Sequence, residues 1–329
     1  MTADAAGGAT RGSVRDVQVL LSTYNGARFL EEQLASLRDQ TVAARMRVLV
    51  RDDGSTDDTV GLLTRFEPGP LVVDVVAGAN VGVVASFAQL LREADRSCSV
   101  FLICDQDDVW LPDKVERAVD AVLAQPDDVP VLYCGRSTIV DERLRPLGVT
   151  DPAPKGPSFV NGLMHNISPG HTMAMNRAML DEGAATLRPA EVFMYDWWLY
   201  ALACAVGRVI VDETPHALYR MHGHNELGYL TTPWQRFWGG VHRVLTLDRS
   251  VWSRQAYALW DAVGPRLNPA DREALLAFLD QHSLASRLSF LRRHGLVYQT
   301  KDFPFVASLL FALGRYRDKD RTGVPDSRA

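Results

Sequence analysis

Short apolar runs alternate with amphipathic segments along the first part of the chain. Four runs have the length and β-branched composition of buried strands: 17–21, 48–50, 72–76 and 100–103. Between them apolar residues recur at helical spacing, as in Leu30, Leu34 and Leu37. This alternation predicts an α/β fold on an open, mainly parallel sheet with right-handed crossovers.

Beyond residue 133 the pattern is less regular. Prolines 152, 154 and 157 predict a loop, and further elements are expected in this order: a strand at 169–176, a helix at 196–205 and short strands at 209–211 and 218–219. From residue 233 the chain reads as mostly helical. We therefore expect a disordered leader at 1–15, an α/β domain at 16–232 and a helical extension at 233–329.

Polar residues follow three of the four predicted strands: Thr23 to Asn25, Asp52 with Asp53, and Asp105 to Asp108. Parallel strands end at one edge of their sheet, where ligands of such folds gather. The sequence thus predicts a site rich in carboxylates at that edge. Asp and Gly are also common in ordinary turns, so each motif by itself is equally compatible with a turn.

The segment Asp105-Gln106-Asp107-Asp108 is the densest group of carboxylates in this part of the chain. Mg²⁺ and Mn²⁺ prefer oxygen ligands, and a bound cation can neutralise a departing diphosphate. Alternate residues of an extended chain share a face, so Asp105 and Asp107 are expected to face one ligand.

Composition narrows the class of protein. A net charge of −5 and a sequence pI near 5.9 argue against nucleic-acid binding. The four cysteines lack CxxC spacing, which is typical of reduced thiols rather than of a zinc site or disulfide scaffold. The chain shows neither a signal peptide nor the ~18 apolar residues of a spanning helix, so we expect a cytoplasmic protein.

Several segments together resemble family 2 glycosyltransferases with the GT-A fold, and in particular bacterial rhamnosyltransferase-like members. The resemblance covers about Val17 to Gly228 and is carried by these segments: LLSTYNGARFLEEQLASLRDQT, VLVRDDGSTDDT, GANVGVVASFAQLL, FLICDQDDVWLPDKVERA, PGHTMAMNR, YDWWLYALA and YRMHGHNELG. It implies a nucleotide-diphospho-sugar transferase domain followed by a helical C-terminal extension.

The resemblance also implies a donor site. The residues expected to bind the donor nucleotide are Thr23, Tyr24, Asn25, Asp52, Asp53, Asn80, Gly82 and Asp105. Asp53 could equally stabilise the turn at Gly54, and the Asn80 to Gly82 segment could simply begin a helix. By the same resemblance Asp107 and His222 hold Mg²⁺ or Mn²⁺, although His224 lies close by in the sequence.

Four further residues are expected near the diphosphate, the sugar or the acceptor: Asp108, Gly170, His171 and Arg220. His171 departs from the family pattern, and its role stays open. Asp196 aligns with the catalytic base of the family. A single ionised carboxylate beside the acceptor hydroxyl would serve an inverting displacement, whereas the alternative for Asp196 is a plain helix N-cap.

The predicted activity is metal-dependent, inverting transfer of a hexosyl group, rhamnosyl by resemblance, from a dTDP- or UDP-sugar. The expected acceptor is a hydroxyl of a glycan or lipid-linked molecule in cell-surface polysaccharide synthesis. Two alternatives stay open: a sugar nucleotidyltransferase and a non-catalytic nucleotide-sugar-binding partner. Aromatic and basic residues at 233–257 and an apolar run at 303–313 would suit peripheral contact with the inner face of the membrane, or else packing on the catalytic domain.

Overall fold

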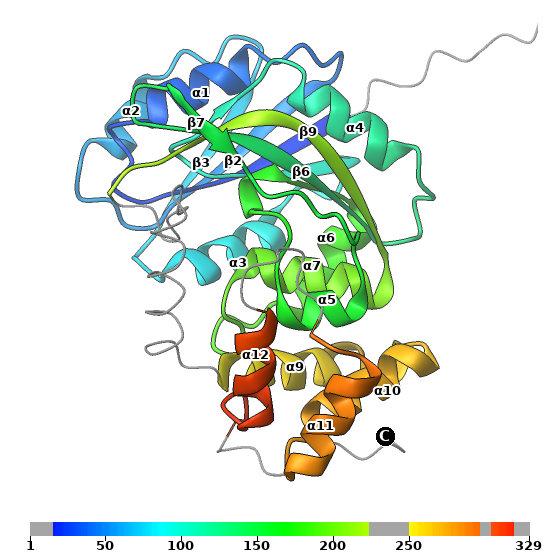
Figure 1. Ribbon diagram of the computed structural model, residues 1–329. Helices are drawn as coiled ribbons and strands as arrows, with labels where there is room; N and C mark the ends of the chain where they lie inside the picture. Colours follow the sequence, from blue (N-terminus) through cyan, green and yellow to red (C-terminus); the bar gives the residue numbers. More distant parts are fainter. Residues whose placement is uncertain (1–15, 224–249, 297–303, 319–329) are drawn as a thin grey trace, which may run out of the picture.

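The computed structural model describes residues 16–223, 250–296 and 304–318 (Figure 1). A mixed sheet lies at the centre of this part of the chain, in the order β3-β2-β1-β4-β8-β6-β9-β5, with β7 paired to β6. Its strands are β1 (Asp16–Thr23), β2 (Arg45–Asp52), β3 (Val72–Ala77), β4 (Val100–Cys104), β5 (Val109–Trp110), β6 (Val131–Val140), β7 (Pro146–Val149), β8 (Met173–Asn176) and β9 (Arg208–Arg220).

The parallel half of the sheet confirms the predicted alternation. Strands β3, β2, β1 and β4 are parallel neighbours. The other half differs from the prediction, because β8 runs antiparallel to both β4 and β6, whereas β6 and β9 are parallel. The two short strands expected at 209–211 and 218–219 form one strand, β9, whose polar centre falls where its pairing with β6 shifts register.

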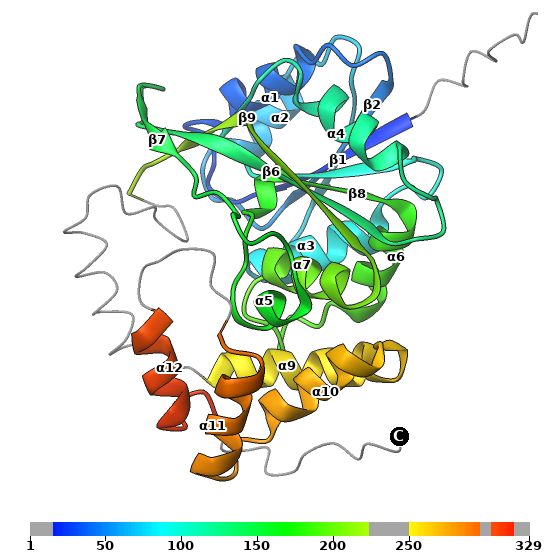
Figure 2. The same cartoon turned by 45° about the vertical axis from the view of Figure 1, so that its right-hand side comes forward.

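Helices cover both faces of the sheet (Figures 1 and 2). One face carries α1 (Leu30–Arg38), α2 (Thr59–Arg65) and α4 (Lys114–Leu123), and the other carries α3 (Val83–Glu93), α5 (Phe159–Met164), α6 (Arg177–Thr186) and α7 (Tyr195–Val206). Each face has its own cluster of buried apolar side chains. Strand β4 is buried along its whole length, as expected for a strand covered on both sides.

The C-terminal helices form a further layer below α5 and α7 (Figure 2). They are α9 (Ser250–Val263), α10 (Pro269–Leu279), α11 (Leu284–Arg293) and α12 (Pro304–Ala312). Trp252 donates a hydrogen bond to the Met164 carbonyl and packs edge-on against Trp197. Buried residues of α9 to α12 belong to the same apolar cluster as α3 and α7, so these four helices pack on the α/β part of the chain.

Within the described ranges, no helix combines the length and apolar character needed to cross a bilayer. All four cysteines are free thiols, as predicted. The expected leader and residues 233–249 of the aromatic and basic stretch lie outside the described residues.

Candidate active site

The ends of β1 and β2 are joined by side chains that occupy the Asp52 carboxylate. Thr23 Oγ1 donates to Asp52 Oδ2 at 2.9 Å, and Ser55 donates to both carboxylate oxygens through its amide and its hydroxyl. Asp52 is 1% exposed. The structure therefore gives Asp52 a role in closing the turn after β2; its predicted contact with the nucleotide base stays a prediction.

Asp53 organises the neighbouring loop. One carboxylate oxygen accepts from Arg51 and from the Val81 amide, and the other accepts from the Gly82 amide at 2.8 Å. Gly82 has a φ of +85°, and it directly precedes α3. These bonds hold Asp53 against the loop that precedes α3, in which Asn80 is exposed. The predicted place of Asp53 beside the nucleotide and its alternative role at the Gly54 turn both stay predictions.

Tyr24 and Asn25 form the exposed rim of this edge. Tyr24 is 47% exposed, and its backbone N–H and C=O both bond to the Gln106 side chain at 2.8 and 2.9 Å. Asn25 has a φ of +48°, and its side-chain oxygen accepts from Thr56. Sequence reasoning missed Gln106, which ties the end of β1 to the acidic segment after β4. No signal in the sequence marks that contact.

Asp105 is the first carboxylate after β4. It lies 3.4 Å from the Tyr195 hydroxyl, which donates to it. Burial, with Asp107 and Asp196 nearby, raises the pKa of Asp105 to about 7. This carboxylate has few partners in the protein, in contrast to Asp52 and Asp53.

Asp107 and His222 are brought together, as the metal prediction requires. Asp107 Oδ2 lies 2.8 Å from His222 Nε2, although the two residues are 115 positions apart in the chain. The Asp107 side chain is 18% exposed and the His222 side chain 6%. His224 lies outside the described residues.

Asp108 and His171 form a second, fully buried pair. Asp108 Oδ2 and His171 Nδ1 lie 3.4 Å apart, and neither has another partner within hydrogen-bonding distance among the described residues. His171 Nε2 bonds to Ser137 at 2.7 Å, and the ring stacks on Tyr219. Burial raises the pKa of Asp108 and lowers the pKa of His171 to about 3.

Arg220 lies beneath the acidic segment rather than at its surface. Its guanidinium donates to the Asp107 carbonyl at 2.9 Å and to the Glu142 carbonyl at 2.8 Å, and it pairs with Glu32. Its backbone N–H donates to Asp108 Oδ1. Because Arg220 is 1% exposed, these contacts give it a positioning role, and its predicted diphosphate contact stays a prediction.

Asp196 lies in the first turn of α7, and Met194 occupies the N-cap. The N-cap alternative is therefore wrong in position. The Asp196 carboxylate accepts from the Trp197 amide at 2.7 Å and from the Gly170 amide at 3.2 Å. Burial raises the pKa of Asp196 to about 6. An added Cβ at Gly170 would lie 2.1 Å from the Tyr195 hydroxyl, which explains why glycine stands there.

The chemistry of two side-chain sets suits a divalent cation. Asp105, Asp108 and His171 offer three ligand atoms within 4.8 Å of one another, two of them buried without a closer partner. Asp107 and His222 form the second set, with side chains that are 18% and 6% exposed, whereas Asp108 and His171 in the first set are fully buried and Asp105 is 35% exposed. Carboxylate oxygen and imidazole nitrogen both bind Mn²⁺, whereas Mg²⁺ favours the oxygen atoms.

The chain is similar in sequence to known glycosyltransferases. Residues 18–183, half of the chain, match the family model described as "Glycosyl transferase family 2". The dTDP-rhamnosyl transferase RfbG of Shigella flexneri is 25% identical over 224 residues, covering 63% of this chain and 73% of RfbG. An uncharacterized glycosyltransferase of Nostoc is 27% identical over 228 residues, covering 64% of this chain and 66% of that protein.

Among solved structures, S. aureus TarS residues 1–349 in complex with UDP-GlcNAc has a similar fold. The TM-score is 0.55 at 16% sequence identity, and the match covers 92% of this chain and 89% of the TarS chain. Because the match covers 92% of the chain, the likeness in fold extends beyond residues 18–183, which the family model matches.

Proposed function

Because the chain belongs to glycosyl transferase family 2, with the GT-A fold and the activity of a glycosyltransferase, we propose that it moves a hexosyl group from a nucleotide-diphospho-sugar to a hydroxyl acceptor. Inversion of the anomeric centre, a rhamnosyl group and a dTDP- or UDP-sugar donor are part of this proposal. Support for the rhamnosyl group comes from the similarity to RfbG alone. The proposed setting is synthesis of a cell-surface polysaccharide.

One contact carries the proposed arrangement, in which the donor lies at the strand ends and the acceptor lies beside Asp196. The Tyr195 hydroxyl donates to Asp105 at the strand edge, and the carboxylate of the next residue, Asp196, has a pKa that burial raises to about 6. In the proposed reaction Asp196 accepts the proton of the acceptor hydroxyl as that oxygen bonds to the anomeric carbon and the carbon–diphosphate bond breaks. A pKa near 6 suits a base that is ionised at neutral pH yet able to take up a proton.

The donor is proposed to lie along the β1, β2 and β4 ends, with its base near Tyr24 and Asn80. Asp107 and His222 would hold Mg²⁺ or Mn²⁺, and the bound cation would neutralise the charge of the departing diphosphate. Asp105, Asp108 and His171 are the rival set. We favour Asp107 and His222 because both side chains are partly exposed, whereas Asp108 and His171 are fully buried.

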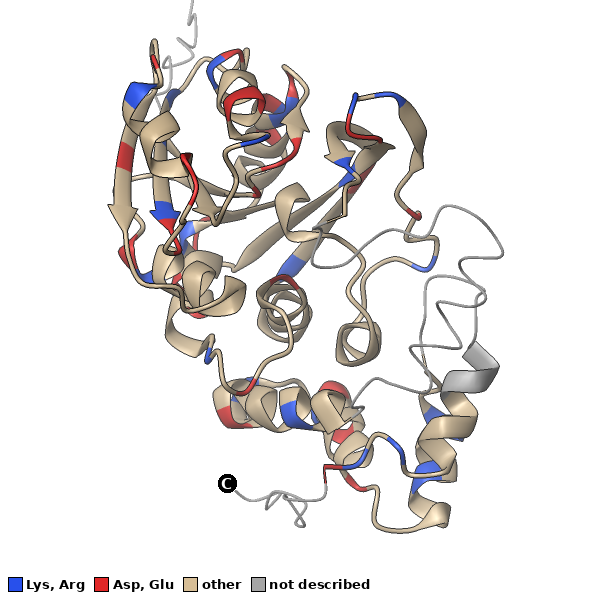
Figure 3. Ribbon diagram, turned by 90° about the vertical axis from the view of Figure 1, so that its left-hand side faces the viewer, with Lys and Arg blue, Asp and Glu red and all other residues tan. Residues whose placement is uncertain are grey.

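Peripheral contact with the inner face of the membrane, at a cytoplasmic location, is the last part of the proposal. Leu284, Leu288 and Arg292 follow one another at intervals of four on exposed positions of α11. Leu309 and Leu313 are exposed in the same way on and just after α12. Figure 3 shows Lys and Arg segments on this part of the chain. Apolar and basic residues together suit anionic lipids.

Vesicle flotation tests this contact better than truncation would, because α9 to α12 share an apolar cluster with α7. The double variant Leu284→Asp/Leu288→Asp should lose binding to anionic vesicles. Leu147→Asp on β7, where the leucine is 50% exposed, is the matched control. If the wild type, the double variant and the control variant bind the vesicles equally, this surface is not the membrane contact.

The activity is tested with a panel of dTDP-, UDP- and GDP-sugars, Mg²⁺ or Mn²⁺, and release of nucleoside diphosphate as the readout. One donor should be turned over with either metal, and Asp107→Asn should reduce that turnover. The family match already disfavours a nucleotidyltransferase. A protein that binds a donor but never releases nucleoside diphosphate, even with lipid-linked acceptors present, would support the non-catalytic alternative.

A further inference from the structure

Phe29 is an unusual residue for the position that it occupies. It is the N-cap of α1, and its side chain makes no capping hydrogen bond. Ser, Thr, Asp or Asn at an N-cap typically adds about 1 kcal/mol of stability that an apolar residue does not supply. A ring at this position therefore calls for another explanation, and its neighbours give one.

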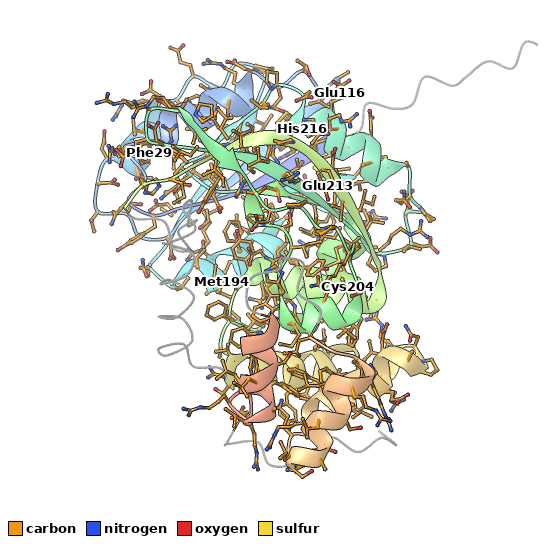
Figure 4. All side chains as sticks on the ribbon, viewed as in Figure 1. Phe29, Glu116, Met194, Cys204, Glu213 and His216 are labelled. Atoms are coloured by element: carbon orange, nitrogen blue, oxygen red, sulfur yellow. The ribbon has the colours of Figure 1, made fainter. Side chains whose placement is uncertain are left out.

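The Phe29 ring contacts the two residues that surround Asp107. Its centroid lies 4.9 Å from that of the His222 ring, at an interplanar angle of 28°. The Arg220 guanidinium carbon lies 4.6 Å from the same centroid, and that of Arg28 lies 4.8 Å away. Figure 4 places Phe29 at the α1 and α2 end of the sheet, far from Met194 at the start of α7.

These contacts connect α1 to the acidic segment through two routes. His222 reaches the Asp107 carboxylate at 2.8 Å, and Arg220 reaches the Asp107 carbonyl at 2.9 Å. Arg220 also pairs with Glu32, one turn into α1. Phe29 thus packs against both groups that fix Asp107, one on its side chain and one on its backbone.

We propose that Phe29 is a positioning residue for the Asp107 and His222 pair, an inference that rests on the metal site of the proposed function. The ring restricts rotation of the His222 imidazole and keeps Arg220 under the segment. Nε2 then stays directed at Asp107 Oδ2 before any ligand arrives. Groups that orient metal ligands in this way commonly change metal affinity about 10- to 100-fold when they are removed.

The test is a Mn²⁺ titration of the full chain, in which free Mn²⁺ is followed by EPR with and without UDP or dTDP. Phe29→Leu keeps an apolar side chain but lacks the flat ring, and it should weaken Mn²⁺ binding about tenfold. Phe29→Tyr retains the ring and should bind within about twofold of the wild type. Thermal unfolding of each variant reports whether the fold is intact.

Phe66→Leu is the matched control. Phe66 follows α2, and the Arg38 guanidinium lies 6.0 Å from its ring, so it has the same kind of cation–π contact away from the acidic segment. Its Mn²⁺ affinity should equal that of the wild type. If Phe29→Leu binds Mn²⁺ as tightly as the wild type, or if Phe66→Leu weakens Mn²⁺ binding as much as Phe29→Leu does, the inference about Phe29 is wrong, whereas the proposed function is unaffected. If the wild type takes up no Mn²⁺ under any condition, the metal site of the proposed function fails, and the inference falls with it.

Discussion

Two groups of carboxylates stand at the same edge of the sheet, but they differ in what surrounds them. After β2, Asp52 and Asp53 are surrounded by donors from Thr23, Ser55, Arg51 and two backbone amides. After β4, Asp105 accepts from the Tyr195 hydroxyl, and in the first turn of α7 Asp196 accepts from two backbone amides. Burial raises the pKa of each carboxyl, to about 7 and about 6.

This difference distinguishes carboxylates that hold loops in place from carboxylates that can transfer a proton or bind a ligand. A carboxylate whose lone pairs are occupied holds loops in place, because moving it would break several bonds to the protein. A carboxyl group whose pKa is raised toward neutrality is a candidate for proton transfer or ligand binding. The comparison predicts opposite consequences when residues of the two groups are replaced.

Replacing Asp196 should have the largest effect on activity. Asp196→Asn removes the proposed base, and we expect kcat to fall about 10²- to 10⁴-fold, the usual contribution of general-base catalysis. The measurement is nucleoside diphosphate release with donor and acceptor saturating. Asp181→Asn, at an exposed position of α6 that pairs with Arg96, is the control and should retain wild-type turnover.

The same substitution should not reduce stability. A pKa raised above the ordinary 3.8 means that the folded protein binds this proton more tightly than the unfolded chain. The stability from this group is therefore full below about pH 4 and is lost as pH rises to about 6. At pH 7 the ionised carboxylate costs at most about 3 kcal/mol. The Asp196→Asn variant should unfold at the same temperature as the wild type or a few degrees higher. A clear loss of stability with full activity would show that Asp196 stabilises the fold and is not the base.

Replacing Asp53 should do the reverse. Asp53→Ala leaves the Arg51 guanidinium, which is 3% exposed, without its carboxylate, and breaking a buried pair in this way typically lowers stability by about 3–5 kcal/mol. Chemical denaturation measures the change. Asp58→Ala breaks an exposed ion pair with Arg65 and should leave the midpoint unchanged. An equally stable Asp53→Ala protein would remove the distinction between the two groups.

The sequence predicted the parallel half of the fold because its strands and helices have simple periodicities. It missed β6, where Gly135, Arg136 and Ser137 interrupt the apolar run. It also split β9 at the polar residues that coincide with a register shift. Both misses concern strands whose pattern is broken by irregular pairing, which periodicity alone does not encode.

Motifs brought the right residues to one edge but could not separate their environments. Asp52 and Asp105 look alike in the sequence, since each follows an apolar strand. Their difference comes partly from side chains distant in the sequence: Thr23 donates to Asp52 and Tyr195 donates to Asp105, contacts that exist only in the folded chain. The pairing of Asp107 with His222 could be expected from the family resemblance, whereas the Phe29 contact could not.

The pH profile gives a smaller effect that sharpens the comparison. If Asp196 is the base and its pKa is about 6, kcat should fall about tenfold between pH 7 and pH 5, since roughly one carboxylate in ten is then ionised. The measurement needs saturating donor and metal at each pH. An acid limb centred near pH 4 would mean that the base lies in an ordinary, solvated environment.

The smallest predicted effect concerns the two hydrogen bonds between the Gln106 side chain and the Tyr24 backbone. Gln106→Ala removes two hydrogen bonds that are each worth about 0.5–1.5 kcal/mol. We expect the KM for the donor to rise about fivefold with kcat nearly unchanged, because Tyr24 lies on the proposed nucleotide side. Gln125→Ala, which removes an exposed contact to Arg208, is the control.

A substitution at Gly26 tests the same two hydrogen bonds, because Gly26 lies against the Gln106 side chain. An added Cβ at Gly26 would lie 2.1 Å from Gln106 Oε1, so Gly26→Ala should displace the Gln106 side chain and raise the KM by a similar factor. Once Gln106 is alanine, that collision is gone. The double variant Gly26→Ala/Gln106→Ala should then be no worse than either single variant, whereas independent effects would multiply to about 25-fold. Multiplicative effects would show that Gly26 acts on the donor side by a route other than Gln106.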